Sequence, residues 1–315
     1  MHIGDLNIDF LSSGHDVKDD LIFYRYALTL KAYGCRIKIF AKSDNPFEVL
    51  EGIQCYGVIK SNWKRIFRFT LGDIKLLSFA LINKADIYII CTPDLLLTGF
   101  ILKYFFRRKV IYNAQENYKV KFLDRDWIPK LLVKLLSKVE SYLGNLMDGI
   151  IVTDSISYKN YEIEKIIILP NFPQIDDILS ENEIIHYWER KVKNEVLNIV
   201  YIGGISKNRG LDIFIKLSEI LPDNILIHLW GKFSNDKEEE KISQNKRIVY
   251  HGFIEHKEIY KELLNYDIGL CLFENTPAYY YYAENTTKLF EYMKAGIPII
   301  VSNFPGLRKI IEDSQ

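Results

Sequence analysis

The alternation of strand-like and helix-like segments constrains the fold of this chain more than any other feature. Short apolar runs typical of buried strands alternate with longer stretches that have helical spacing. Consecutive parallel strands need a crossover, usually a helix, so this succession predicts a parallel sheet with helices on both faces. The expected strands are residues 2–11, 36–41, 87–91, 109–112, 149–152 and 166–169, and the expected helices include 19–33 and 127–145.

The pattern breaks at residues 170–177, "PNFPQIDD", where prolines and acids replace the apolar runs. Such a stretch is typical of a connection between domains. We therefore expect a first domain at residues 1–172, an interdomain segment at 173–196 and a second domain at 197–315, with both domains facing a central cleft. The expected strands of the second domain are residues 197–201, 225–230, 247–251, 268–272 and 297–301.

Charge divides unevenly along the chain, although the formal net charge is zero. Residues 1–173 carry 24 Lys plus Arg against 19 Asp plus Glu, and the remainder carries the opposite excess. A basic first half suits a membrane face or an anionic substrate.

The four cysteines form no C-x-x-C pair. This favours reduced thiols, a cytosolic location and no structural metal. No signal peptide is expected, because Asp5 and Asp9 interrupt the first ten residues. The most hydrophobic stretch, residues 87–106, contains Pro93, Asp94 and Lys103 and is too broken for a membrane span.

Glycines and an arginine follow the first strand of the second domain, in "IVYIGGISKNRG". Gly203 and Gly204 would let backbone N–H groups approach a phosphate, and the Arg209 guanidinium would offer a positive charge with paired N–H donors. An ordinary tight turn between a strand and a helix explains the same glycines. This stretch alone leaves both interpretations open.

Two strand ends of the first domain also carry polar residues. Gly14, His15 and Asp16 follow the first strand and form a plausible ligand surface. Gln115 and Glu116 follow the strand at 109–112, and we expect them, with the preceding Asn113, to point into the cleft. Ordinary solvated loops are the alternative for both stretches.

A short helix at residues 288–295 ends at Gly296 and leads directly into an apolar strand. Lys288 and Glu291 lie three positions apart, so they share a face near the start of this helix. A surface ion pair is one interpretation. The other is that the helix start presents donors and charge to an anion.

Four stretches together resemble the nucleotide-sugar-dependent glycosyltransferases of family 4, which have the GT-B fold. They are "HDVKDDLIFYRYALTLKAYGCRIKIFAK", "VIYNAQENY", "PNFP…IVYIGGISKNRGLDIFI" and "NTTKLFEYMKAGIPIIVSNFPG". Their order and spacing match the family over nearly the whole chain, and "KLFEYMKAGIPII" is the most specific. The resemblance implies an α/β protein of two Rossmann-like doubly wound domains, with the acceptor on the first and the nucleotide sugar on the second.

The resemblance also implies transfer with retention of anomeric configuration, with a UDP- or GDP-linked donor and no metal or other cofactor. In it, Glu291 corresponds to the carboxylate that binds the ribose hydroxyls, and Arg209 to a basic residue on the diphosphate. The expected donor-binding set is completed by Gly203, Gly204, Lys288 and Leu289. The expected acceptor-binding residues are Gly14, His15 and Asp16, and the expected catalytic residues are Gln115 and Glu116.

The sequence departs from the family pattern at several positions. Ala283 stands where relatives have a glutamate eight residues before Glu291, and Glu284 is one position off. Gly204 replaces a basic residue of the phosphate loop. The remaining departures are Gln115 in place of a histidine, Asn113 in place of an aspartate and Leu21 in place of an arginine. Only 24 residues follow Glu291, so the second domain is expected to be incomplete.

The expected function is a retaining glycosyltransferase that acts on a glycan or lipid-linked acceptor in surface polysaccharide biosynthesis. The alternative is a catalytically weak relative that binds a nucleotide sugar or a partner enzyme, and a nucleotide-sugar epimerase is a more distant one. Residues 62–69 and 103–109 interleave aromatic and basic side chains. They indicate peripheral contact of the first domain with the inner face of a membrane, or else a solvated face. No nucleic-acid partner is expected.

Overall fold

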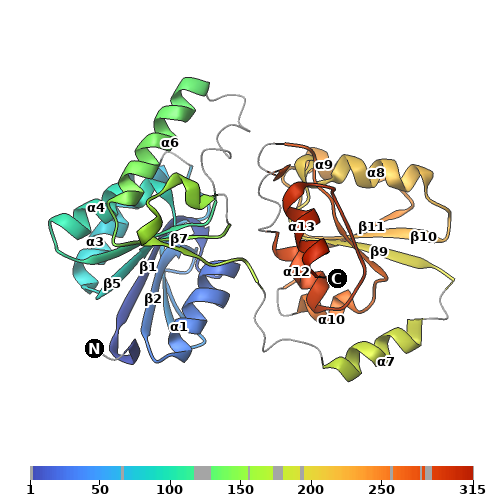
Figure 1. Ribbon diagram of the computed structural model, residues 1–315, viewed down its shortest axis with the longest axis horizontal. Helices are drawn as coiled ribbons and strands as arrows, with labels where there is room; N and C mark the ends of the chain where they lie inside the picture. The colour runs from blue at the N-terminus through green and yellow to red at the C-terminus, as the bar shows by residue number, and fades with distance from the viewer. Residues whose placement is uncertain are drawn as a thin grey trace. The chain divides into compact units, whose positions relative to one another are not determined.

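The chain folds into two compact units, Met1–Pro170 and Asn171–Gln315, each a sheet flanked by helices (Figure 1). Strands that neighbour each other in these sheets pair in parallel, apart from one edge hairpin, so the expected α/β class with two doubly wound sheets is confirmed. The computed structural model describes residues 3–64, 67–116, 129–154, 157–172, 180–191, 195–255, 258–276, 279–280 and 286–314.

The sheet of the first unit has the strand order β3-β4-β2-β1-β5-β6-β7-β8. Its antiparallel edge hairpin, β3 with β4, was not expected from the sequence. Glu51 and Gly52 both have positive φ and form its tight turn. The strands are β1 (Asn7–Asp16), β2 (Arg36–Lys42), β3 (Phe47–Leu50), β4 (Ile53–Ile59), β5 (Ile87–Ile90), β6 (Lys109–Ala114), β7 (Gly149–Val152) and β8 (Ile166–Ile168).

Strand β1 differs from its expected bounds at both ends. A 3-10 turn, Ile3–Asp5, precedes it, and the strand continues to Asp16. Its pairing with β2 is regular as far as Leu11, then shifts and resumes at Asp16 with Lys42. Gly14, His15 and Asp16 therefore lie in an irregular strand end and not in a free loop.

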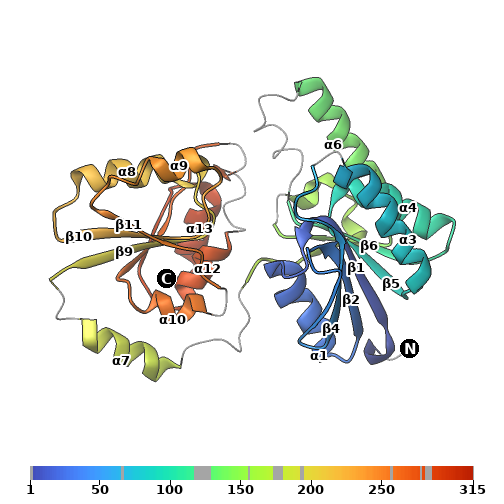
Figure 2. The ribbon, with the colours of Figure 1, turned by 180° about the vertical axis from the view of Figure 1, so that it is seen from behind.

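Helices cover both faces of the first sheet (Figure 2). The expected helix at 19–33 begins as a π-helical segment, Asp20–Ala27, and continues as α1, Leu28–Ala32. The Asp19 carboxylate caps its start by accepting hydrogen bonds from the Leu21 and Ile22 amides, both at 3.1 Å. The other face carries a short π-helical turn, Arg68–Gly72, and the helices α3 (Asp73–Asn83), α4 (Leu96–Tyr104) and α6 (Lys130–Asn145).

The sheet of the second unit has the order β11-β10-β9-β12-β13. Its five strands match the expected series closely: β9 (Leu197–Ile202), β10 (Ile225–Trp230), β11 (Ile248–Gly252), β12 (Ile268–Cys271) and β13 (Ile299–Val301). Helices α8 (Leu211–Ile220) and α9 (Asp236–Glu240) flank one face (Figure 1). Helices α10 (Ile259–Leu263), α12 (Thr287–Lys294) and α13 (Pro305–Asp313) pack on the other, and α7 (Glu181–Lys191) precedes the sheet.

Candidate functional site

Two strand ends of the second unit touch through their backbones, and only glycine fits there. The Gly203 amide donates to the Trp230 carbonyl at 2.9 Å, and Gly203 and Gly231 have φ of +134° and +137°. A Cβ on Gly231 would lie 1.9 Å from the Gly203 carbonyl oxygen. This contact fixes the path of the chain immediately after β9.

The loop after β9 places Arg209 against its own glycines. The Tyr201 hydroxyl donates to the Gly204 carbonyl at 2.7 Å, and Arg209 Nε donates to the Tyr279 hydroxyl at 3.2 Å. A Cβ on Gly204 would lie 2.7 Å from an Arg209 guanidinium nitrogen. The absence of a side chain at 204 therefore makes room for the guanidinium directly on the loop.

Lys288 brings a second cation to the same loop from α12. Its ammonium nitrogen lies 3.6 Å from the centre of the Tyr201 ring and would be 3.3 Å from a Cβ on Gly203. The residue is only 8% exposed, and the nitrogen makes no hydrogen bond among the described residues. Glu291 is only 5% exposed, so the two side chains do not form the exposed surface pair that the spacing alone allowed.

Burial lowers the pKa of Lys288 to about 7, and the neighbouring Arg209 charge acts in the same direction. Glu291 and Cys271 oppose the shift without cancelling it. A buried ammonium without a hydrogen bond is costly, and an anion that neutralised it would relieve this cost. The arrangement can therefore accept a negatively charged group.

The remaining residues of α12 hold it in place. Leu289 is completely buried in the core, and its amide donates to the Thr286 carbonyl at 3.1 Å, so it packs the helix and its side chain is not available to a ligand. Gly296, with φ of +68°, ends the helix as expected. Ala283 and Glu284, which bear on the altered glutamate spacing, lie outside the described residues.

In the first unit, Gly14 and Asp16 are exposed and His15 is half-buried. The Ser12 hydroxyl holds His15, at 2.9 Å from Nδ1 and 3.0 Å from the backbone amide. These residues are close together because they are consecutive in the chain.

A polar cluster lies beside them that sequence patterns did not reveal. The Ser13 hydroxyl lies 3.0 Å from the Thr92 hydroxyl and donates to the Asp94 carboxylate. Burial, together with the neighbouring Asp94 carboxyl, raises the pKa of Asp73 to about 8. The cluster joins β1 to the segment after β5 and to α3, so only the tertiary fold assembles it.

Gln115 lies directly after β6, as expected, and Glu116 beside it is exposed. The Gln115 carbonyl accepts a hydrogen bond from the Thr153 hydroxyl at 3.0 Å, whereas its side-chain Nε2 makes none within the described part of the chain. The expectation for Asn113 was wrong. This residue is completely buried, because β6 continues through it to Ala114.

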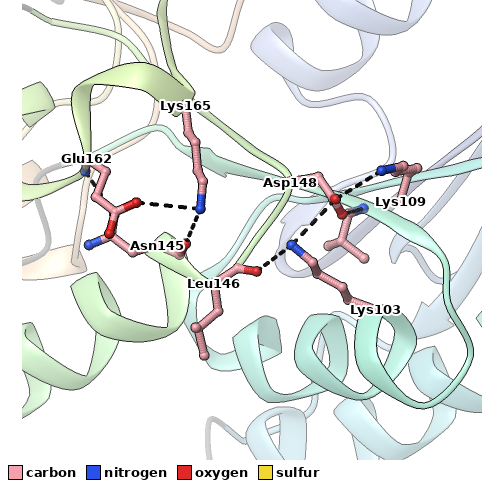
Figure 3. Close-up of polar contacts among 8 residues, drawn as sticks. Lys103, Lys109, Asn145, Leu146, Asp148, Glu162 and Lys165 are labelled. Atoms are coloured by element: carbon pink, nitrogen blue, oxygen red, sulfur yellow. Dashed lines mark hydrogen bonds and ion pairs between the residues drawn. The ribbon is translucent and has the colours of Figure 1, made fainter.

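Two basic residues expected on a membrane face are instead partly engaged in internal ion pairs (Figure 3). Lys103 and Lys109 lie 3.4 Å and 3.3 Å from the same oxygen of Asp148. Lys103 also donates to the Leu146 carbonyl at 2.7 Å. In the other segment Trp63 packs against the core, and residues 65–66 lie outside the described chain. Every helix in the described part of the chain is too short or too polar to span a membrane.

Residues 185–315 match the family model "Glycosyl transferases group 1". Sucrose-phosphate synthase from Thermosynechococcus elongatus superimposes with a TM-score of 0.75 at 13% identity, over 97% of this chain and 83% of that one. The Anabaena protein HepE in complex with UDP-glucose gives 0.70 at 16% identity, with the same coverage.

A curated relative, an uncharacterized 41.2 kDa protein in the cps region of Klebsiella pneumoniae, is 23% identical over 238 residues. The match covers 68% of this chain and 60% of that relative. The protein therefore has the GT-B fold, and its residues 185–315 carry the sequence features of group 1 glycosyltransferases.

Proposed function

We propose that this protein is a retaining glycosyltransferase that moves a sugar from a UDP- or GDP-linked donor to a glycan or lipid-linked acceptor. In this proposal the second unit binds the donor and the first unit binds the acceptor. The observation that carries it is the buried Lys288 ammonium, which has no hydrogen bond among the described residues and lies against Gly203.

The geometry around Lys288 suits the diphosphate of a nucleotide sugar. Arg209 lies on the same loop at Gly204, and the first turn of α12 adds the positive end of a helix dipole. The leaving nucleoside diphosphate gains negative charge as the glycosidic bond breaks. Fixed cations at that place stabilise the transition state by a few kcal/mol each, on the order of magnitude found for preorganised donors.

Lys288 offers a physical reason why the phosphate loop can lack a basic side chain at position 204. Gly204 leaves room for the Arg209 guanidinium, and Lys288 comes within reach of the loop from α12. We propose that these two cations together replace the missing one, and that no metal ion or further cofactor takes part. Glu291, buried one turn further along α12, would accept hydrogen bonds from the ribose hydroxyls.

Surface polysaccharide synthesis is the proposed setting. The curated relative is encoded in a cps region, and the lipopolysaccharide outer core galactosyltransferase WaaB also shares the fold, with a TM-score of 0.55 at 15% identity. We place the protein in the cytoplasm at the inner face of the membrane, where a lipid-linked acceptor would be reached.

Titration calorimetry with UDP-glucose and with a GDP-linked sugar tests the donor site. Glu291→Ala should weaken binding by about 1–3 kcal/mol, the cost of removing a partner from a charged hydrogen bond. Lys288→Met should weaken it by a similar amount. Glu312→Ala and Lys309→Met change the same charges at exposed positions of α13 and should bind normally. Unchanged affinity in both folded site variants would refute the donor site, and binding without any sugar transfer would favour the catalytically weak alternative.

A further inference from the structure

Helix α6 of the first unit exposes an unusually large apolar surface. Only Val133, Glu140 and Gly144 on it are buried, and they form a narrow stripe along one side. Leu131 is 81% exposed, Leu135 57% and Tyr142 66%. Since side chains three or four positions apart share a helix face, these three residues form one row opposite the buried stripe. Leu132, Leu136 and Val139 are also exposed and widen that row.

A row of lysines runs beside the apolar row. Lys130, Lys134 and Lys138 are spaced by four residues and are all exposed. The helix contains one acid, Glu140, which is buried and accepts hydrogen bonds from the hydroxyls of Tyr112, at 2.8 Å, and Tyr161. The outer side of α6 is therefore apolar and positively charged, with no exposed carboxylate.

Hydrogen bonds hold the C-terminal end of α6. The side of the helix opposite its buried stripe therefore faces away from the first unit in a fixed direction. Lys165 donates to the Asn145 carbonyl at 3.1 Å and Lys103 donates to the Leu146 carbonyl at 2.7 Å, so two ammonium groups cap the C-terminal carbonyls (Figure 3). Helix α4 packs along α6 in the same layer. At the end of α4, Tyr104, Phe105, Phe106 and Arg107 are also exposed.

We infer that the outer side of α6 docks on an anionic lipid surface, with the helix lying flat at the headgroup level. Its 16 residues span about 24 Å and carry three lysines, which suits a helix in the plane of the interface and not one across the bilayer. The leucines enter the acyl boundary while the lysine row contacts lipid phosphates. An apolar row bordered by lysines alone complements anionic lipid in both properties.

This inference rests on the proposed function and extends it. Lipid binding through α6 would hold the first unit at the membrane that carries a lipid-linked acceptor. Lipid binding is measured without donor or transfer. The two proposals can therefore fail separately.

Co-sedimentation with vesicles of phosphatidylcholine containing phosphatidylglycerol tests the lipid surface. The protein should pellet with these vesicles at low salt, and much less with pure phosphatidylcholine. Leu131→Glu/Leu135→Glu should weaken binding on the order of tenfold or more, because it places charge in the apolar row. Ile220→Glu is the matched control, since Ile220 is equally exposed, at 77%, on α8 of the second unit.

A second pair of variants tests how much the lysine charges of α6 contribute to lipid binding. Lys130→Gln/Lys134→Gln/Lys138→Gln should weaken binding to the anionic vesicles by roughly tenfold or more. The control Lys216→Gln/Lys237→Gln/Lys246→Gln removes the same charge from exposed positions of the second unit and should bind as the unaltered protein does.

A fluorescent label on the helix provides a direct readout of contact. All four native cysteines are buried, so a solvent-sensitive thiol dye would report on Leu135→Cys alone. Its emission should shift to shorter wavelength on anionic vesicles, whereas the same dye on Ile220→Cys should not. The inference is overturned if the protein does not bind anionic vesicles, or if the Leu131→Glu/Leu135→Glu variant binds them as the unaltered protein does. It is also overturned if that variant only converts a dimer into a monomer, because the surface then joins two copies of the chain.

Discussion

The ammonium nitrogen of Lys288 lies 3.6 Å from the centre of the Tyr201 ring, and the hydroxyl of the same tyrosine donates to the Gly204 carbonyl. One aromatic side chain thus contacts both a buried cation and the backbone of the glycine loop. The ring face stabilises the cation without offering a hydrogen-bond acceptor. The ammonium hydrogens therefore stay available to an anion at the loop.

Donor affinity should fall as the pH rises through about 7. The pKa of Lys288 is lowered to about 7, so above this pH the free protein is increasingly uncharged there and must take up a proton to bind a diphosphate. We expect a loss of up to about tenfold per pH unit between about pH 7 and pH 9. UDP-glucose is the right probe, because its phosphates are diesters and lack the pKa near 6 of a phosphate monoester.

Calorimetry at pH 6.5, 7.5 and 8.5 in buffers of different ionisation enthalpy measures both the affinity and the proton uptake. The exposed-lysine variant Lys309→Met should keep the pH dependence. A flat profile in the unaltered protein would show that Lys288 does not meet the phosphates.

Gly231→Ala should disrupt the glycine loop more than Gly252→Ala. Both glycines have positive φ, which costs alanine about 1 kcal/mol, but only a Cβ on Gly231 would collide with the Gly203 carbonyl, at 1.9 Å. A Cβ on Gly252 would have nothing within 4 Å. We expect Gly231→Ala to lower both the Tm and UDP-glucose affinity, and Gly252→Ala to lower the Tm slightly and leave affinity unchanged. Equal effects of the two variants in scanning calorimetry and titration would contradict the backbone contact.

Asp73→Asn should stabilise the protein at neutral and alkaline pH. The pKa of Asp73 is raised to about 8 in the folded protein, so between about pH 4 and pH 8 the unfolded chain ionises while the native carboxyl keeps its proton. Stability is therefore lost as the pH rises through this window, and asparagine removes that loss. The Tm should rise at pH 7.5 and change little at pH 4, by about 2–4 °C for each kcal/mol gained.

Asp86→Asn is the control of opposite sign. Hydrogen bonds from Asn7 lower the pKa of the Asp86 carboxyl, so this group stabilises the fold above pH 4 and its removal should lower the Tm at pH 7.5. If Asp73→Asn also lowers the Tm at pH 7.5, the Asp73 carboxyl is ionised in the native protein and its pairing with Asp94 is different from that described.

Gln115→His should raise the rate of transfer by about tenfold. An imidazole at the end of β6 can make a charge-assisted hydrogen bond to a sugar hydroxyl, which a carboxamide cannot, and the difference is on the order of 1–2 kcal/mol. Steady-state assays with a competent donor and acceptor measure this. Donor affinity should stay the same, because the nucleotide is proposed to bind the other unit. If the substitution leaves the rate of transfer unchanged, Gln115 is not a catalytic residue.

Much of the fold followed from local patterns. The strands β2, β7 and β10 match the expected segments within a residue, because apolar runs bounded by turn residues are properties of a few neighbouring positions. The β3–β4 hairpin was missed because its outer strand, β3, has only four residues and exposes Phe47 and Val49, so no apolar period marks it.

The site could be predicted only as a set of candidates. The sequence identified Gly203, Arg209, Lys288 and Glu291 as candidates, and the structure brings Lys288 to Gly203 and Arg209 to the adjacent Gly204. Asn113 was misplaced, because the strand end that buries it depends on pairing with β7 and not on its own neighbours in the chain.

The sequence by itself determined the succession of strands and helices, the two units and the position of the glycine loop, since backbone preference and apolar period act over short distances. Only the tertiary structure decided that the Lys288 ammonium is buried over Tyr201, that Asp73 meets Asp94, and that the leucines of α6 face outward. Burial and pairing are set by residues remote in the chain, and a side chain's charge state and exposure follow from them.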